Sequence, residues 1–121
     1  MTDRDFRRIA LGMQGAMEGE HMAHPDFRAN GRIFATLSTD PGWACIVKLT
    51  PEQQRQFVDA DPETFVPAKG AWGRAGSTMV RLESADGETI GEAMTLAWQG
   101  TLKAATPRAK QPQQQQKKKA R

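Results

Sequence analysis

The 121-residue sequence contains one cysteine, Cys45, so an internal disulfide is impossible. Such sparse use of cysteine is typical of a reducing compartment, and we expect a cytoplasmic protein. No apolar run approaches the roughly 20 residues that a bilayer-spanning helix needs, and the N-terminal segment lacks the long apolar stretch of a signal peptide. These absences exclude a disulfide-stapled or membrane-spanning protein, and the length predicts one domain with a single core.

Acidic residues are missing from residues 103–121, which carry seven of the 17 lysines and arginines. Residues 1–102 hold all 14 acids against the other ten bases, so their net charge is −4 and that of the tail is +7. From Thr106 onward the chain is low in complexity and cannot bury enough apolar surface to offset its ordering entropy. We therefore expect a folded domain, 1–102, and a disordered Gln/Lys-rich basic tail, 103–121.

The segment Gly31–Leu49, GRIFATLSTDPGWACIVKL, is the predicted centre of the fold. It contains two runs of β-branched and aromatic residues around a five-residue polar turn, which predicts a hairpin. Neither run has a wholly polar face, so we expect two central strands covered at least partly on both sides. Strict alternation places Phe34 on the face opposite to Ala35, and Trp43 and Cys45 are interpreted as core residues.

Helices are expected at both ends of the domain and after the hairpin. Apolar spacing and capping signals place them at residues 3–13, 50–59 and 86–105. Thr50 and Gln53 form a capping-box pattern at the start of the middle helix, which is expected to bury Phe57 and Val58. The last helix is expected to fray from Gly100 onward.

Shorter strands complete an α+β domain. They are expected at 18–23, 26–29, 65–66 and 77–82. Pro25 is expected to mark a turn or strand end because it lacks an amide donor, and Asn30-Gly31 is the strongest tight-hairpin dipeptide in the chain. The glycine-punctuated segment 69–76 is interpreted as a loop in which Trp72 is an anchor packed on the core.

The most metal-like cluster lies around the first two strands. Its members are Glu18, Glu20, His21, His24 and Asp26. Imidazole and carboxylate groups suit zinc or iron, but His21 and His24 fall on opposite faces of a strand and no HExxH helix is present. We expect no metal and no cofactor, with a small-ligand site near His24 as a weaker alternative. No catalytic residue is expected, since the apolar neighbours of Cys45 indicate an inert buried thiol.

Basic and aromatic residues outline a candidate nucleic-acid surface. Lys69, Trp72 and Arg74 form a tip of the kind that can meet a phosphate or a base. Bases on the predicted strands would extend it into a patch: Arg28, Arg32, Lys48 and Arg81. Lys117, Lys118 and Lys119 of the tail would add a salt-dependent, non-specific attraction. The alternatives are solvated strand charges and a tail that only aids solubility; the net charge of residues 1–102 also counts against a duplex-binding surface.

Three segments in order carry a family resemblance: EGEHMAHPDFRANGRIFATL, WACIVKLTPEQQ and DPETFVPAKGAWGRAGSTMVRL. Together they resemble the MmcQ/YjbR-like family of small bacterial proteins over roughly residues 3–100. The resemblance implies an α+β fold, in which an antiparallel sheet of about five or six strands is flanked by terminal helices and one inserted helix. The positions that match the family pattern are His24, Pro25, Asp26, Phe27, Arg28, Gly31, Phe34, Lys48, Leu49, Trp72, Gly73 and Arg81.

The same resemblance implies a function in two ways. Family members are commonly labelled DNA-binding from a double-wing-like fold, whereas similarity to type III secretion chaperones implies a module that binds peptide segments on its sheet. No catalytic residues are carried over from the family. We therefore predict a small non-enzymatic protein that binds DNA or another nucleic acid, with a protein partner as the alternative and no membrane contact.

Overall fold

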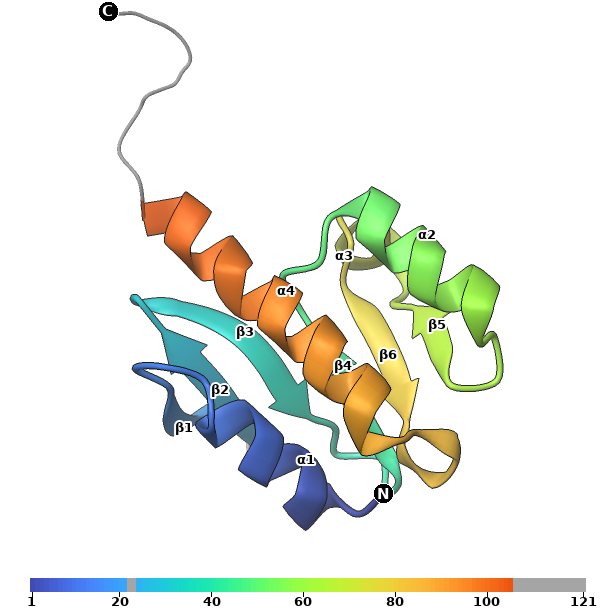
Figure 1. Ribbon diagram of the computed structural model, residues 1–121, viewed down its shortest axis with the longest axis horizontal. Coiled ribbons are helices and arrows are strands. Elements are labelled where there is room, and N and C mark those ends of the chain that lie inside the picture. The colour runs from blue at the N-terminus through green and yellow to red at the C-terminus, as the bar shows by residue number, and fades with distance from the viewer. Residues whose placement is uncertain (22–23, 106–121) are drawn as a thin grey trace, which may run out of the picture.

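The computed structural model describes residues 1–21 and 24–105, and within these ranges it shows an α+β fold with a six-stranded antiparallel sheet (Figure 1). The strands are β1 (Met17–His21), β2 (His24–Ala29), β3 (Arg32–Leu37), β4 (Trp43–Ile46), β5 (Phe65–Pro67) and β6 (Thr78–Arg81). The helices are α1 (Asp3–Leu11), α2 (Pro51–Ala60), α3 (Gly70–Arg74) and α4 (Gly87–Ala105). The strand order β1-β2-β3-β4-β6-β5 confirms the predicted hairpin as the central pair. Disorder is predicted for the tail, and residues 106–121 of this tail lie outside the described residues.

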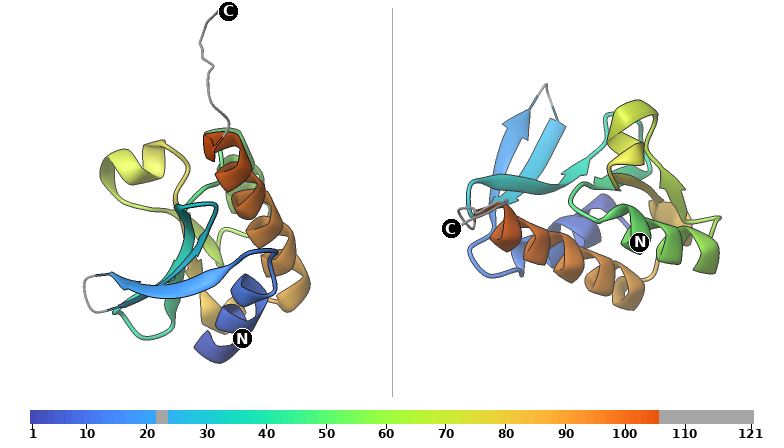
Figure 2. Two further views of the ribbon diagram at one scale, coloured as in Figure 1. Left: turned by 90° about the vertical axis from the view of Figure 1, so that its left-hand side faces the viewer. Right: turned by 90° about the horizontal axis from the view of Figure 1, so that it is seen from above.

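The strand register sorts side chains onto two faces of the sheet. One row of paired positions crosses all six strands and consists of Gly19, Asp26, Thr36, Cys45, Met79 and Val66. We call the face that carries this row the open face. Helices α1, α2 and α4 lie on the other side, the covered face, whereas α3 rises on the side of the open face (Figure 2).

The core lies between the covered face and the helices. Phe27, Ile46 and Phe65 of the sheet are at most 1% exposed, and they meet fully buried side chains of α1 and α4 such as Phe6 and Met94. The Phe6 and Phe27 rings lie 6.3 Å apart between centroids. This packing, rather than intrinsic propensity, holds the helices on the sheet.

A bulge in β3 changes one prediction for the hairpin. Phe27 pairs with Ala35 and Arg28 pairs with Ile33, so Phe34 is the extra residue between the two pairs. Phe34 and Ala35 are both fully buried. The extra residue interrupts the strict alternation of a strand, on which the expected face of Phe34 depended.

The capping signals correctly predicted where α2 begins. The Thr50 hydroxyl accepts from the Gln53 amide at 3.1 Å, and the Gln53 side chain accepts from the Thr50 amide at 2.9 Å. However, Phe57 and Val58 are only half-buried, and the buried residue of this helix is Gln54. A polar side chain therefore occupies the innermost position of α2.

Two glycines in helices are explained by close packing. Helix α4 continues through Gly100 to Ala105 instead of fraying there, and a Cβ on Gly100 would lie 2.9 Å from the Lys48 carbonyl oxygen. In α3, a Cβ on Gly73 would overlap the Ala68 carbonyl oxygen. Both glycines let a helix approach a neighbouring backbone more closely than any side chain would permit.

Two further expectations are corrected. Pro25 lies inside β2, opposite Glu20, and the pairing of β2 with β3 begins only at Asp26, so no amide from residue 25 is needed there. The segment expected to be a loop contains α3, and Trp72 is 69% exposed instead of packed on the core. Because Gly73 turns its backbone inward, the neighbouring Trp72 faces solvent. No helix in the described ranges has the length and apolar character needed to cross a membrane.

Candidate nucleic-acid interface

The connections at the two ends of the sheet carry opposite charges. Connections 47–50 and 68–77 lie where β4 ends and β6 begins, and we call this the basic end (Figure 1). Its charged residues are Lys48, Lys69 and Arg74, with no acid in these two connections. Connections 38–42, 61–64 and 82–86 form the acidic end, which carries Asp40, Asp61, Glu63, Glu83 and Asp86 and no base.

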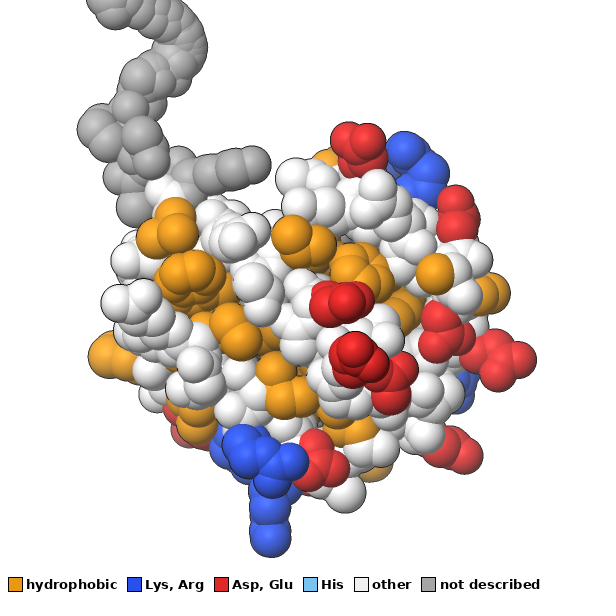
Figure 3. All heavy atoms as spheres, in the orientation of Figure 1, with side chains coloured by type: hydrophobic (Ala, Val, Ile, Leu, Met, Phe, Trp, Pro, Cys, Tyr) orange, Lys and Arg blue, Asp and Glu red, His pale blue; other side chains and the backbone are white. Residues whose placement is uncertain are grey.

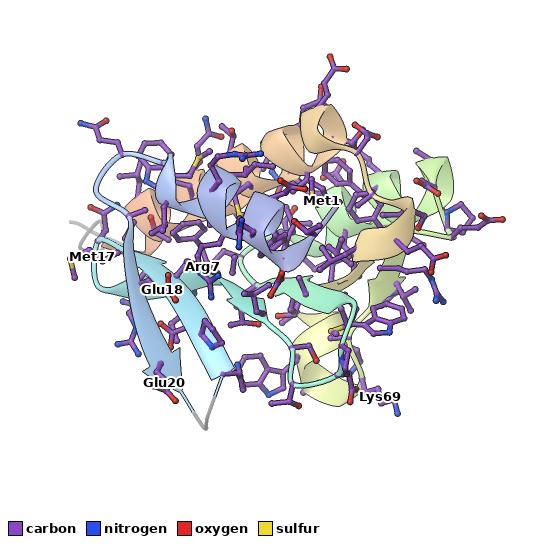
Figure 4. The ribbon with its side chains drawn as sticks, turned by 90° about the horizontal axis from the view of Figure 1, so that it is seen from below. Met1, Arg7, Met17, Glu18, Glu20 and Lys69 are labelled. Carbon is purple, nitrogen blue, oxygen red and sulfur yellow. The ribbon has the colours of Figure 1, made fainter. Side chains whose placement is uncertain are left out.

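Acidic side chains are also prominent in one view of the surface. Figure 3 shows several of them over α2 and the start of α4. Lys69 instead points away from α1 and α4, on the side of the open face (Figure 4). The net charge of −4 for residues 1–102 is therefore unevenly distributed, because the connections at one end of the sheet carry bases and those at the other end carry acids.

A groove of about 500 Å³ lies at the basic end, between α3 and the chain that joins β4 to α2. Trp72 of α3 and Ala75, directly after this helix, form one wall, and Lys48 and Pro51 lie on the other side. Of the predicted surface residues, Trp72 and Lys48 line the groove, whereas Lys69 and Arg74 lie in the same short segment as Trp72 but are not among the lining residues. An exposed indole that shares a groove with Lys48, in a segment that also carries Lys69 and Arg74, offers a stacking surface and electrostatic attraction to a polyanion.

A buried glutamine holds this groove in shape. The Gln54 amide group donates to the carbonyl oxygens of Gly73 and Ser77, at 2.9 Å each. The two bonds tie the end of α3 to α2, and the Ser77 hydroxyl donates to the Val47 carbonyl at 3.2 Å. Sequence reasoning missed Gln54, although it falls on the same helical stripe as Phe57 and Val58, where a polar residue signals a buried hydrogen bond.

The remaining predicted bases are not at the groove. Arg81, the last residue of β6, borders the acidic end, where its guanidinium sits 4.7 Å from the Trp43 ring centroid and donates to the Glu63 carbonyl. Arg28 lies on β2, and Arg32 begins β3 after the Asn30-Gly31 turn. The structure therefore separates Arg81 from the other bases, and Lys117, Lys118 and Lys119 lie outside the described residues.

Arg28 takes part in an ion pair that the sequence analysis did not foresee. Its Nε and Nη2 donate to the two carboxylate oxygens of Asp26, at 2.8 and 3.0 Å. The Asp26 side chain is fully buried while that of Arg28 is 44% exposed. These hydrogen bonds raise the pKa of the Arg28 guanidinium, so the group stays charged at all relevant pH values.

The cluster around His24 is divided by the sheet. Glu18 points to the covered face, where it binds Arg7 of α1 at 3.1 Å (Figure 4), whereas Asp26 lies on the open face. In the part of the chain that the structure describes, no group of three His, Cys, Asp or Glu residues is placed to hold a metal ion. The side chain of His21 lies outside the described residues.

Cys45 lies in the middle of the open face. Burial raises the pKa of its thiol to about 11, although a hydrogen bond from the Thr78 backbone lowers it in part. A thiol with this pKa is almost entirely protonated near neutrality and is a poor nucleophile.

The other positions of the family pattern have structural roles. Phe27 and Phe34 are buried in the core, and Gly31 completes the β2–β3 turn with a positive φ of 76°. The preceding Asn30 has φ 55°, as expected for a two-residue hairpin of this type. These three residues contribute to the core and to a turn, and they are not part of the basic end.

These features define a small α+β protein with one helix-covered sheet face and a basic groove at one end of the sheet. A YjbR family model matches residues 11–100, and the chain belongs to the YjbR family. Its fold is similar to that of a Deinococcus radiodurans protein with a DUF419 domain, known from a crystal structure. The TM-score is 0.66 at 19% identity, over 80% of this chain and 75% of that chain. Comparison with curated proteins found no match.

Proposed function

We propose that this YjbR-family protein is a non-enzymatic, cytoplasmic protein that binds single-stranded nucleic acid at its basic end. The observation that supports this most directly is Trp72, which is 69% exposed on α3 between Lys69 and Arg74. Leaving a tryptophan in water forgoes a large part of its burial energy. An unpaired base that stacks on the indole would recover that energy.

The charge distribution favours a single strand over a duplex. The basic end offers a few cations around a groove, and residues 1–102 carry a net charge of −4. Specific duplex-binding surfaces are larger and far more positive. A single strand has unstacked bases that reach an aromatic side chain directly, and the basic tail adds an attraction that does not depend on sequence.

The first test replaces Trp72 in the full-length chain. Trp72→Ala is expected to weaken binding of a fluorescent oligo(dT) about tenfold, because one stacked base contributes about 1–3 kcal/mol. Trp72→Phe is expected to keep most of the affinity, since it retains an aromatic face. Leu11→Ala, which removes another exposed apolar side chain (40% exposed, on α1), serves as the control and should leave binding unchanged. Equal affinity of Trp72→Ala and the native protein would contradict stacking.

The second test separates the basic end from the tail. Lys69→Gln with Arg74→Gln is expected to reduce the slope of log affinity against log salt by about 1.4, because each lost contact to a single strand contributes about 0.7. Arg4→Gln with Arg8→Gln on α1 removes the same charge and should not change the slope. If only the triple change of Lys117, Lys118 and Lys119 to Gln lowers the slope, the tail alone attracts nucleic acid and the groove has no part in it.

A further inference from the structure

The Arg28 guanidinium is fixed on the open face in one orientation. Both of its hydrogen bonds within the described residues go to Asp26, through Nε and Nη2. The edge formed by Nη1 and the second Nη2 proton points away from that carboxylate, because the five donors of a guanidinium lie in one plane. With 44% of the side chain exposed, this outer edge is available to a ligand.

The neighbouring strand is shaped around this ion pair. Gly19 of β1 is the paired position of Asp26, and a Cβ there would lie 2.9 Å from Asp26 Oδ1 and 3.2 Å from Arg28 Nε. At these distances a Cβ at position 19 would make the Asp26 carboxylate and the Arg28 guanidinium shift from their present positions. A fully buried carboxylate, an arginine and a glycine on adjacent strands thus form a built site.

A structural role alone explains this arrangement poorly. Buried or half-buried ion pairs contribute little net stability, since apolar side chains of similar volume often do as well or better. A carboxylate that is hydrogen-bonded to one edge of a guanidinium fixes its orientation. The other edge can then donate two hydrogen bonds to a ligand with two adjacent acceptor oxygens. Asp26 partly neutralises the positive charge of Arg28. The ion pair therefore helps phosphate binding by orienting the guanidinium more than by increasing the electrostatic attraction.

We propose that Arg28 is a phosphate-binding residue of the open face, with Asp26 as its positioning residue and Gly19 as the space that admits the pair. Arg28 would bind the two non-bridging oxygens of one phosphodiester group. The inference rests on the proposed function in one respect, because this phosphodiester belongs to a nucleic-acid strand that also occupies the Trp72 groove.

The sheet sets the distance between the two sites. Arg28 pairs with Ile33 on β3, the Val47 amide donates to Phe34 on the same strand, and Val47 and Ser77 line the Trp72 groove. The path crosses two to three strand spacings, or about 10–14 Å.

The test uses the full-length protein and a fluorescent oligo(dT). Arg28→Lys keeps the charge but loses the planar fork, and is expected to weaken binding about tenfold. Asp26→Asn is expected to weaken it in the same direction, because it releases the guanidinium. Arg7→Lys makes the same change at the arginine–glutamate pair on the covered face and should not alter affinity. Thermal unfolding of each variant checks that the fold is intact.

A second variant and a second probe keep the two proposals distinct. Gly19→Ala displaces the pair without removing a charge, and should weaken oligo(dT) binding as Asp26→Asn does. Inorganic phosphate should shift the NMR resonance of the Arg28 Nε–Hε group more than chloride at matched ionic strength does. This shift would support the anion site even if no oligonucleotide bound and the proposed function failed.

Three results would overturn the inference. The first is that the Arg28→Lys and Gly19→Ala variants are folded and bind oligo(dT) as tightly as the native protein does. Another is an Arg28 resonance that responds equally to phosphate and chloride. The third is a loss confined to guanine-containing oligonucleotides, since the outer edge of Arg28 would then read the O6 and N7 acceptors of a base instead of a phosphate.

Discussion

The basic and acidic ends of the sheet differ in what their charges do for the fold. At the acidic end the carboxylate of Asp86 caps α4, since it accepts from the Thr89 amide at 2.8 Å. At the basic end, Lys48, Lys69 and Arg74 form no ion pair with any residue that the structure describes. The shape of the basic end depends instead on Gln54 and Gly73, which are uncharged. Cations that the fold does not use remain available to a partner, and this is why we place the proposed binding site at the basic end.

The largest effect is expected from a glycine of the basic end. Gly73→Ala should destabilise the protein by about 3 kcal/mol, because its methyl group would overlap the Ala68 carbonyl oxygen and force α3 from the sheet. Gly91→Ala in α4 is the matched control. No atom lies within 4 Å of a Cβ there, and alanine should stabilise the helix by about 0.5–1 kcal/mol. Urea unfolding measures both, and equal stabilities of the two variants would mean that α3 is not packed as described.

A smaller loss is expected from the glutamine that supports the groove. Gln54→Ala removes two hydrogen bonds and leaves the Gly73 and Ser77 carbonyls without this buried donor, which should cost about 2 kcal/mol. Gln56→Ala, at an exposed position of the same helix, should change stability by less than about 0.5 kcal/mol. Urea midpoints compare the two, and a Gln54→Ala midpoint equal to that of Gln56→Ala would show that the basic end does not depend on this contact.

The smallest effect concerns the acidic end and appears only in acid. The Thr89 amide and hydroxyl lower the pKa of Asp86 from its ordinary value of 3.8. A carboxyl group with a lowered pKa contributes stability above about pH 4, and this contribution is lost as the pH falls through the folded-state pKa. Asp86→Asn still caps the helix but does not titrate, so its melting temperature should fall less between pH 7 and pH 3 than that of the native protein.

Asp59→Asn, which removes an exposed acid of α2, is the control for this comparison. If Asp86→Asn and the native protein lose stability equally in acid, then Asp86 is not the group that links pH to stability at this end.

Local signals in the sequence predicted the elements well. Thr50 and Gln53 start α2, and Asn30-Gly31 makes the β2–β3 turn, because caps and tight turns are decided by residues close in sequence. The bulge at Phe34 was not predictable in this way, since a bulge depends on the pairing of β3 with β2. The exposure of Trp72 depends on the contact between Gly73 and the Ala68 carbonyl, which no periodicity reveals.

The candidate site stays a prediction, and only the placement of its residues can be compared with the sequence. Trp72 and Arg74 lie in α3, and Lys69 directly precedes it. The separation of Arg81 follows from the direction of β6, which runs from the basic end to the acidic end. The pairing of Asp26 with Arg28 could have been anticipated, because residues two apart on a strand share a face. The role of Gly19 required the register of β1 with β2.

The position of Cys45 also means that the reactivity of its thiol depends on whether the central strands are closed or open. With a pKa of about 11, only about one thiol in 10⁴ is ionised at pH 7, roughly 100-fold fewer than for a thiol of pKa 9.0. Alkylation of the native state is therefore slow, and transient opening of the central strands restores the ordinary reactivity. The alkylation rate of this single cysteine thus measures how often the sheet opens, without any added label.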